Sequence, residues 1–274
     1  RLAQAVAKCG QLGVVSGTAL DQVLLRRLQD GDPDGDMRRA LDHFPFPAMA
    51  ARIRDAFYIP GGKAPNAPYH RLPEPGMHLS REACELFIVA NFVEVYLAKE
   101  GHGNAIGINF LEKIQRPHLP SAYGAMLAGV DYVLMGAGIP LKIPGALDAI
   151  SRYEVATYPL AVKGADANDQ FLMSFNPLDY VEGEPPVLKR PDFLAIISSN
   201  TLATTMLKRA NGKVNGFIVE GHVAGGHNAP PRGKLELDEN GEPIYGERDV
   251  VDLPKLRELN VPFWLAGGYG NAEG

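Results

Sequence analysis

Short apolar runs that alternate with helical segments constrain the fold of this 274-residue chain more than any other feature. Each run holds four to six residues, which is the usual length of a strand buried on both faces. Polar or glycine-rich residues follow the runs. Six such runs occur, at 12–16, 105–110, 132–135, 193–198, 216–219 and 261–266.

The alternation of strands and helices predicts parallel β/α units. Such units build either a closed (β/α)₈ barrel of the TIM type or a doubly wound sheet, and in both folds ligands bind at the carboxyl ends of the strands. No GxGxxG pattern follows the first run, so the barrel is favoured over a dinucleotide-binding sheet. A barrel needs eight strands. We therefore expect an α/β fold of the TIM type whose first strand lies before Arg1 and whose last lies after Gly274.

Helical periodicity with recognisable end residues predicts helices between the strands. Ser80, Ser199 and Asp252 stand where N-caps are expected. A weakly alternating stretch at 153–162 is interpreted as one arm of a hairpin. The predicted helices cover 1–9, 21–29, 80–99, 121–128, 145–151, 199–209 and 252–259.

Two polar, proline-bearing stretches interrupt the pattern. Residues 32–79 hold eight of the 22 prolines, so little regular structure is expected there beyond a helix at 49–57. Five aromatic residues in that stretch indicate packing on the domain, or on a second subunit of a homo-oligomer, rather than a disordered linker. The expected organisation is the start of the barrel at 1–31, an insertion at 32–79 and the rest of the barrel at 80–274, with an insertion at about 152–192 and a hairpin at about 234–246 around Asn240-Gly241.

Composition excludes several classes of partner. The net charge is −5 and no basic cluster alternates with aromatic residues, so nucleic acid is not an expected partner. No apolar run approaches the roughly 20 residues that span a bilayer, so no membrane association is expected. Cys9 and Cys84 fall on apolar faces of predicted helices. They are predicted to be buried free thiols in a reducing, cytoplasmic compartment.

The stretch 215–233 combines a strand with a glycine-rich loop. After the apolar run 216–219, the loop holds adjacent glycines, Gly225 and Gly226, followed by His227. A glycine pair lets the backbone approach a flat or charged ligand, and its amides can point at an anion. Histidine exchanges a proton near neutral pH. The pattern predicts a ligand cradle with an acid/base group; a glycine turn with a surface histidine is the alternative.

Five strand-and-loop motifs resemble those of one family. They resemble successive motifs of the nitronate monooxygenases, formerly called 2-nitropropane dioxygenases, a family that includes flavin-dependent enoyl reductases and quinone reductases. The AGGH of 224–227, set after a strand and followed by a Gly-Gly after the next strand, is the most specific part. The motifs are GVVSG at 13–17, GINFLEK at 107–113, AIISSNT at 195–201, VEGHVAGGH at 219–227 and FWLAGGYG at 263–270.

The resemblance implies an FMN-binding (β/α)₈ barrel with His227 as its catalytic residue. Glu220 stands where many members carry a glutamine that contacts the flavin. Gly267 and Gly268 would give their amides to the FMN phosphate. The residues that the resemblance places at the cofactor are Asn109, Ser198, Glu220, Gly221, Gly225, Gly226, Gly267 and Gly268.

Three functions remain as hypotheses. The first is an FMN-dependent oxidation of alkyl nitronates, with O₂ as second substrate. The second is an FMN-dependent reductase that takes hydride from NAD(P)H for an enoyl thioester or a quinone. The third is a barrel without cofactor that serves as an interaction subunit.

Other candidate residues can be explained by a structural role, such as helix capping or a surface ion pair, as well as by a functional one. His222, His227 and Glu220 lack the third ligand run of a typical metal loop, so no metal is expected. Ser198 and Ser199 lack a GxSxG elbow, which favours helix capping or flavin contact. Glu112 and Lys113 could line the barrel mouth or form a surface ion pair. Five histidines in loops or insertions are expected to be solvated: His43, His70, His78, His102 and His118.

Overall fold

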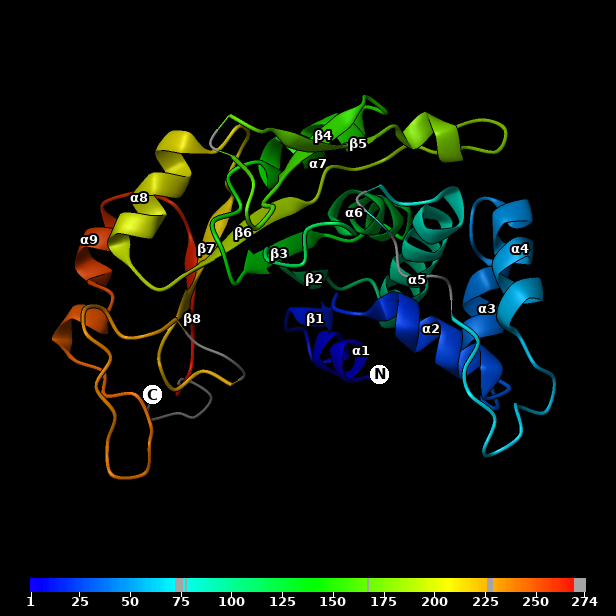
Figure 1. Ribbon diagram of the computed structural model, residues 1–274, viewed down its shortest axis with the longest axis horizontal. Coiled ribbons are helices and arrows are strands. Elements are labelled where there is room, and N and C mark those ends of the chain that lie inside the picture. Colours follow the sequence, from blue (N-terminus) through cyan, green and yellow to red (C-terminus); the bar gives the residue numbers. More distant parts are fainter. Residues whose placement is uncertain (72–75, 77, 167, 226–228, 269–274) are drawn as a thin grey trace.

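The computed structural model describes residues 1–71, 76, 78–166, 168–225 and 229–268. This part of the chain forms a curled sheet of six parallel strands with helices packed around it (Figure 1). The strands of the sheet are β1 (Gly13–Ser16), β2 (Ile106–Leu111), β3 (Tyr132–Gly136), β6 (Asp192–Ile197), β7 (Gly216–Glu220) and β8 (Phe263–Ala266).

The order of strands in the sheet is the order of the chain, β1-β2-β3-β6-β7-β8, and every neighbouring pair is parallel. A doubly wound sheet reverses its strand order at a switch point, whereas this sheet runs in one direction as a barrel wall does. All six predicted strands are confirmed. The sheet ends at β1 and β8 without closing, so the fold is compatible with part of a TIM-type barrel and is not a complete one.

The helices that follow the strands begin near the predicted caps. The Ser80 Oγ accepts a hydrogen bond from Ala83 N at 3.2 Å, and the Ser199 Oγ accepts one from Leu202 N at 3.0 Å. Asp252 Oδ1 accepts one from Lys255 N at 3.1 Å. These three caps start α5 (Arg81–Lys99), α8 (Asn200–Arg209) and α9 (Leu253–Arg257). The other predicted helices are α1 (Leu2–Lys8), which precedes β1, and α2 (Leu20–Gln29), α6 (His118–Leu127) and α7 (Ile143–Ser151).

Residues 32–79 are more regular than the proline count predicts. They contain α4 (Pro47–Phe57), which confirms the helix expected at 49–57, and also α3 (Asp36–Asp42), which was not predicted. Pro47 sits in the first turn of its helix, where a missing N–H costs nothing. The Phe44 ring packs edge-on against Phe92 of α5, with centroids 4.9 Å apart. The insertion therefore covers the α5 side of its own domain.

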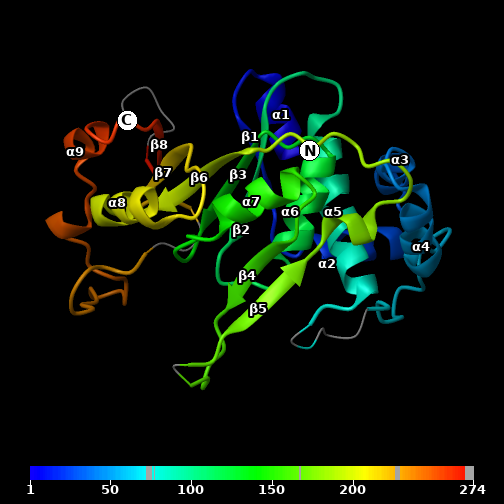
Figure 2. The same ribbon diagram turned by 90° about the horizontal axis from the view of Figure 1, so that it is seen from above.

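The second insertion contains a hairpin that projects away from the sheet (Figure 2). Its arms are β4 (Ala156–Leu160) and β5 (Phe171–Phe175), paired antiparallel, so the hairpin arm predicted at 153–162 is confirmed. A short 3₁₀ helix, η1 (Pro177–Tyr180), follows it. The expected hairpin at 234–246 is a tight turn with a single antiparallel bridge between Leu237 and Pro243 rather than a two-stranded ribbon.

A single hydrophobic core runs from the first helices to α9. Its closest helix contact joins α5 and α6, where a Cβ added to Gly124 would overlap the Ile88 carbonyl oxygen. Both cysteines are free thiols, but only Cys84 is buried. The prediction for Cys9 is wrong, because α1 ends at Lys8 and Cys9 caps it on the exposed side. Among the described residues, no helix has both the length and the hydropathy to cross a bilayer.

Candidate functional site

Two glycine loops lie against each other at the carboxyl ends of β7 and β8. The Gly221 N–H donates to the Ala266 carbonyl at 2.9 Å, and the Ala224 N–H donates to the Gly221 carbonyl at 3.0 Å. A Cβ on Gly267 would lie 2.6 Å from Ala224 N, so only glycine allows this approach. The loops thus meet because their strands are neighbours, as the sequence predicts.

Backbone amides in these loops are available to a ligand. The N–H groups of Gly225, Gly267 and Gly268 donate no hydrogen bond to the rest of the described chain. Gly267 and Gly268 have φ values of 100° and 80°, a left-handed conformation that strains other residues. Consecutive amides in such a turn can converge on an anion. The arrangement suits a phosphate or a carboxylate.

Ser198, Glu220 and Gly221 come together beside the loops, around a small space of about 20 Å³. Arg232 spans its far side, where Nη2 donates to the Ser198 carbonyl at 2.8 Å and the backbone N–H donates to Asp249 Oδ1 at 2.8 Å. Hydrogen bonds from the backbone N–H of Gly246 and then of Arg232 hold the pKa of Asp249 below its ordinary value. A space of this size holds about one water molecule, so it is not an enclosed pocket for an organic ligand.

His222 is engaged by an aromatic neighbour, because its ring stacks on Tyr245 with centroids 5.0 Å apart. Gly226 and His227, predicted to contact the cofactor and to act as the catalytic group, lie outside the described residues. Among the residues that are described, no three His, Cys, Asp or Glu side chains are grouped as metal ligands would be.

Asn109 is not brought together with the glycine loops. It lies on β2, and β3 and β6 separate it from β7. Its Oδ1 is buried and has no hydrogen-bond partner among the residues that the structure describes. A buried carbonyl oxygen without a partner is unusual in proteins, so Asn109 remains a residue that a ligand or a neighbouring segment could satisfy.

Glu112 and Lys113, on the loop after β2, have different neighbours: Glu112 contacts the β4–β5 hairpin, and Lys113 lines a cavity. The Glu112 carboxylate accepts a hydrogen bond from the Tyr158 hydroxyl at 2.7 Å, which ties the loop to the β4–β5 hairpin. Gly138 makes room for this carboxylate, because a Cβ there would overlap it. Lys113 lines a large cavity, as expected for a residue at the mouth of the sheet.

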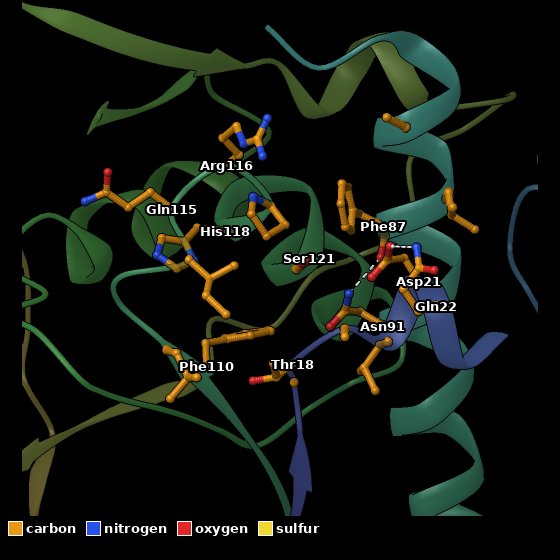
Figure 3. Close-up of a pocket in the computed structure, with 18 of the residues that line it drawn as sticks. Thr18, Asp21, Gln22, Phe87, Asn91, Phe110, Gln115, Arg116, His118 and Ser121 are labelled. Carbon is orange, nitrogen blue, oxygen red and sulfur yellow. Dashed lines mark hydrogen bonds between the residues drawn. The ribbon is translucent and has the colours of Figure 1, made fainter. Parts of the chain in front are cut away.

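That cavity has a volume of about 990 Å³ and lies at the carboxyl ends of β1 and β2, between α2, α5 and α6 (Figure 3). Its volume is at the upper end of the range for ligand sites. Much of its wall is apolar, with Leu20, Leu86, Phe87 and Phe110 among the lining residues. The sequence predicted ligand binding at the carboxyl ends of the strands, but at β7 and β8 rather than here.

Three buried polar side chains line the cavity: Asn91 is 1% exposed, and His118 and Ser121 are each 3% exposed. Asn91 comes from α5, whereas His118 and Ser121 are three residues apart on α6 and so lie on one face of that helix. Asn91 and Ser121 are seen around the same space in Figure 3. These residues were not singled out as site residues from the sequence.

His118 is buried, so the prediction that it is solvated is wrong. The helix α6 begins three residues before the predicted start. His118 is therefore the first residue of the helix and is buried, rather than lying in an exposed loop. The His118 Nε2 lies 2.9 Å from the Glu112 carbonyl, so Nε2 carries the proton and Nδ1 is an acceptor. Burial lowers the pKa of His118 below its ordinary value, against the opposing effect of that hydrogen bond. The apolar residues on every side of 118–127 were the available signal for a buried helix.

Comparison with known proteins adds no relative. A scan against models of protein families gives no match, and a search among curated proteins gives none. The geometry itself offers two kinds of chemistry: anion binding at β7 and β8 by glycine amides that have no acceptor in the described part of the chain, and enclosure of an organic molecule at β1 and β2.

Proposed function

We propose that this chain is an FMN-dependent oxidoreductase of the nitronate monooxygenase type, and that its six parallel strands belong to a TIM-type (β/α)₈ barrel. The described parts of the five motifs that carry the family resemblance lie at strands of one parallel sheet, β1, β2, β6, β7 and β8. The observation that carries the proposal is the set of backbone amides of Gly225, Gly267 and Gly268, on two adjoining loops, that have no acceptor among the described residues.

These residues fit the phosphate end of FMN. A phosphate needs converging N–H donors, and the three glycines offer donors that nothing else in the described chain uses. Gly267 is obligatory in this arrangement because of its contact with Ala224. When bound, FMN supplies the electron acceptor for oxidation of an alkyl nitronate and the electron donor to O₂.

We propose His227 as the acid/base group on the loop. Its ordinary pKa is near neutrality, which suits a group that removes a proton from a carbon beside a nitro group. If the substrate arrives as an anionic nitronate, no proton needs to leave, and His227 would serve to bind it. Loss of the imidazole then raises KM and leaves kcat nearly unchanged.

Flavin binding is tested by absorbance and by titration with FMN. We expect the protein to hold FMN, and Gly267→Ala to weaken the affinity by about tenfold or more because the added Cβ forces the two loops apart. Gly164→Ala is the matched control: Gly164 also has a positive φ, 83°, but nothing lies within 4 Å of the added Cβ. A protein that stays colourless at saturating FMN contradicts the proposal and favours the interaction subunit.

The role of His227 is tested by steady-state kinetics. We expect His227→Asn to lower kcat/KM for nitronate oxidation by about two to four orders of magnitude, the usual contribution of a general acid or base. His222→Asn, whose native ring stacks on Tyr245, is the control and should change kcat/KM little. An unchanged kcat/KM for His227→Asn removes this histidine from the mechanism.

A reductase is the second candidate, and the cavity at β1 and β2 favours it. A volume of about 990 Å³ is far more than an alkyl nitronate fills, whereas an enoyl thioester or a quinone could occupy it. Oxygen uptake with a nitronate and no nicotinamide supports the oxidase. Bleaching of the flavin by NAD(P)H supports the reductase.

A further inference from the structure

We propose that the cavity between α2, α5 and α6 binds an amphiphilic organic anion whose apolar body carries an N–H or O–H donor. This site is separate from the glycine loops of β7 and β8, and the proposal does not rest on FMN.

Asn91 defines the donor that the ligand must carry. The Asn91 Nδ2 donates to the Phe87 carbonyl one helical turn earlier, at 2.8 Å. This bond fixes the orientation of the amide, so Oδ1 is the atom left over, and it is buried without a hydrogen-bond partner among the described residues. The Asn91 side chain lies at the cavity (Figure 3). Leaving a buried carbonyl unsatisfied costs free energy, so a ligand that brings an N–H or O–H recovers that free energy.

The walls define the body of the ligand. Phe110 is buried and Phe87 half-buried, and both line the cavity together with Leu20, Leu86 and Leu160. An apolar chain or ring placed along these residues is stabilised in proportion to the apolar surface that it removes from water. The buried Ser121 hydroxyl offers a second polar contact within the same wall.

Charges at the rim define the head group. Among the described residues that line the cavity, the cations are Arg26, Arg71, Lys113 and Arg116, while the acidic member is Asp21. Asp21 accepts a hydrogen bond from Gln22 Nε2 at 2.8 Å. The chain as a whole carries a net charge of −5, so the described part of the rim is opposite in sign to the protein. Such a rim attracts an anion and repels a cation.

Calorimetric titration with matched amphiphiles tests each part of the ligand. The reference probe is N-decanoylglycine, below its critical micelle concentration, because it joins an apolar chain, an amide N–H and a carboxylate. We expect its methyl ester, which lacks the charge, and decanoate, which lacks the N–H, to bind about tenfold more weakly each. The phosphate ester of N-decanoylethanolamine shows whether a phosphate head binds better than a carboxylate.

Variants locate the binding. Asn91→Leu should lower the affinity for N-decanoylglycine by about tenfold and remove the preference over decanoate. The double variant Arg26→Gln, Arg116→Gln changes only exposed residues and so leaves the core intact. It should lower the affinity for N-decanoylglycine by roughly fivefold and remove the preference for the acid over its methyl ester. Lys208→Gln is the control, because it removes an exposed cation on α8, which does not line the cavity. This variant should bind N-decanoylglycine as tightly as the native protein does.

The outcomes separate this proposal from the flavin proposal. The amphiphile proposal is overturned if none of the anionic probes binds. It is also overturned if the arginine double variant binds N-decanoylglycine as tightly as the native protein does. This second test does not depend on whether Asn91→Leu folds, because the two arginines are exposed. Equal affinity for ester and acid overturns the anionic head. If the protein binds N-decanoylglycine but takes up no FMN, the amphiphile proposal stands and the flavin proposal is rejected. If it takes up FMN but binds none of the amphiphiles, the flavin proposal stands and the amphiphile proposal is rejected.

Discussion

His118 shows how the surroundings of one residue can change its pKa. The same imidazole in a loop would titrate near neutrality, but at the start of α6 it is shielded from water and keeps its proton on Nε2 for the Glu112 carbonyl. Its pKa is lowered chiefly by burial. The folded protein therefore holds this side chain neutral beside the cavity.

The lowered pKa makes the stability depend on pH. As pH falls below about 6.5, the unfolded chain protonates His118 before the folded chain does, so the free energy of unfolding decreases until the folded pKa is passed. We expect His118→Gln, whose amide can still donate to the Glu112 carbonyl, to flatten this decrease. Urea unfolding at several pH values between neutrality and pH ~4 measures it. His43→Gln, at an exposed histidine, controls for loss of any imidazole; an unchanged slope in His118→Gln contradicts the expectation.

Part of the site could be predicted at this scale and part could not. Gly221, Gly267 and Ser198 follow strands, and the carboxyl ends of parallel strands share one edge, so their gathering could be read from the chain. Asn91 and Ser121 lie on two helices, and periodicity shows which face of a helix is apolar but not which helix faces it. Their meeting depends on tertiary packing that no local pattern encodes.

At the scale of elements, the backbones of α5 and α6 are in direct contact at Gly124. Gly124 has no side chain, which lets the α6 backbone rest on the Ile88 carbonyl of α5. This contact also sets the separation between Asn91 on α5 and Ser121 on α6. The two helices form the rear of the cavity, so their spacing decides its width.

A methyl group at this contact should wedge the helices apart. We expect Gly124→Ala to lower the free energy of unfolding by roughly 1–3 kcal/mol or more, because backbone rather than a movable side chain opposes the new Cβ. Gly103→Ala is the control, since nothing lies within 4 Å of a Cβ there. Chemical denaturation of the two variants provides the comparison; equal midpoints would show that the helices separate at no cost.

Strands were more predictable than the connections between them. A run such as 132–135 is apolar, β-prone and bounded by turn residues, and it pairs on both sides as expected. The helix α3 was missed because the prolines around it suggested irregular chain. Pro33 and Pro45 lie outside α3 and Pro47 starts α4, so these prolines bound helices instead of breaking them.

On the scale of the whole molecule, the two edges of the sheet differ from its middle. Every residue of β8 is at least partly exposed, with Trp264 at 45%, whereas four of the six residues of β2 are buried. At the other edge Val14 of β1 is 37% exposed. Stability follows buried apolar contact, so the β8 edge is the weaker part of the sheet.

Hydrogen exchange should reveal this gradient. We expect amides of β8 to exchange well before those of β2 and β3, because opening the edge exposes little buried surface. Trp264, the single tryptophan, should report its fluorescence transition at lower urea than the loss of helical circular dichroism. Peptides covering 106–111 serve as the internal reference in the exchange experiment. Coincident exchange and coincident transitions would mean that the sheet unfolds as one unit.

The agreement between strand order and chain order has a consequence for biosynthesis. As the chain leaves the ribosome, each strand emerges when its neighbour is already present, so no strand has to enter between two that have paired. Among the described strands of the sheet, the longest delay comes before β2, which pairs with β1 only after α2, α3, α4 and α5 have been made. During that interval the β1 edge is exposed on the nascent chain, and this delay is the step at which a growing chain is most open to pairing with another copy.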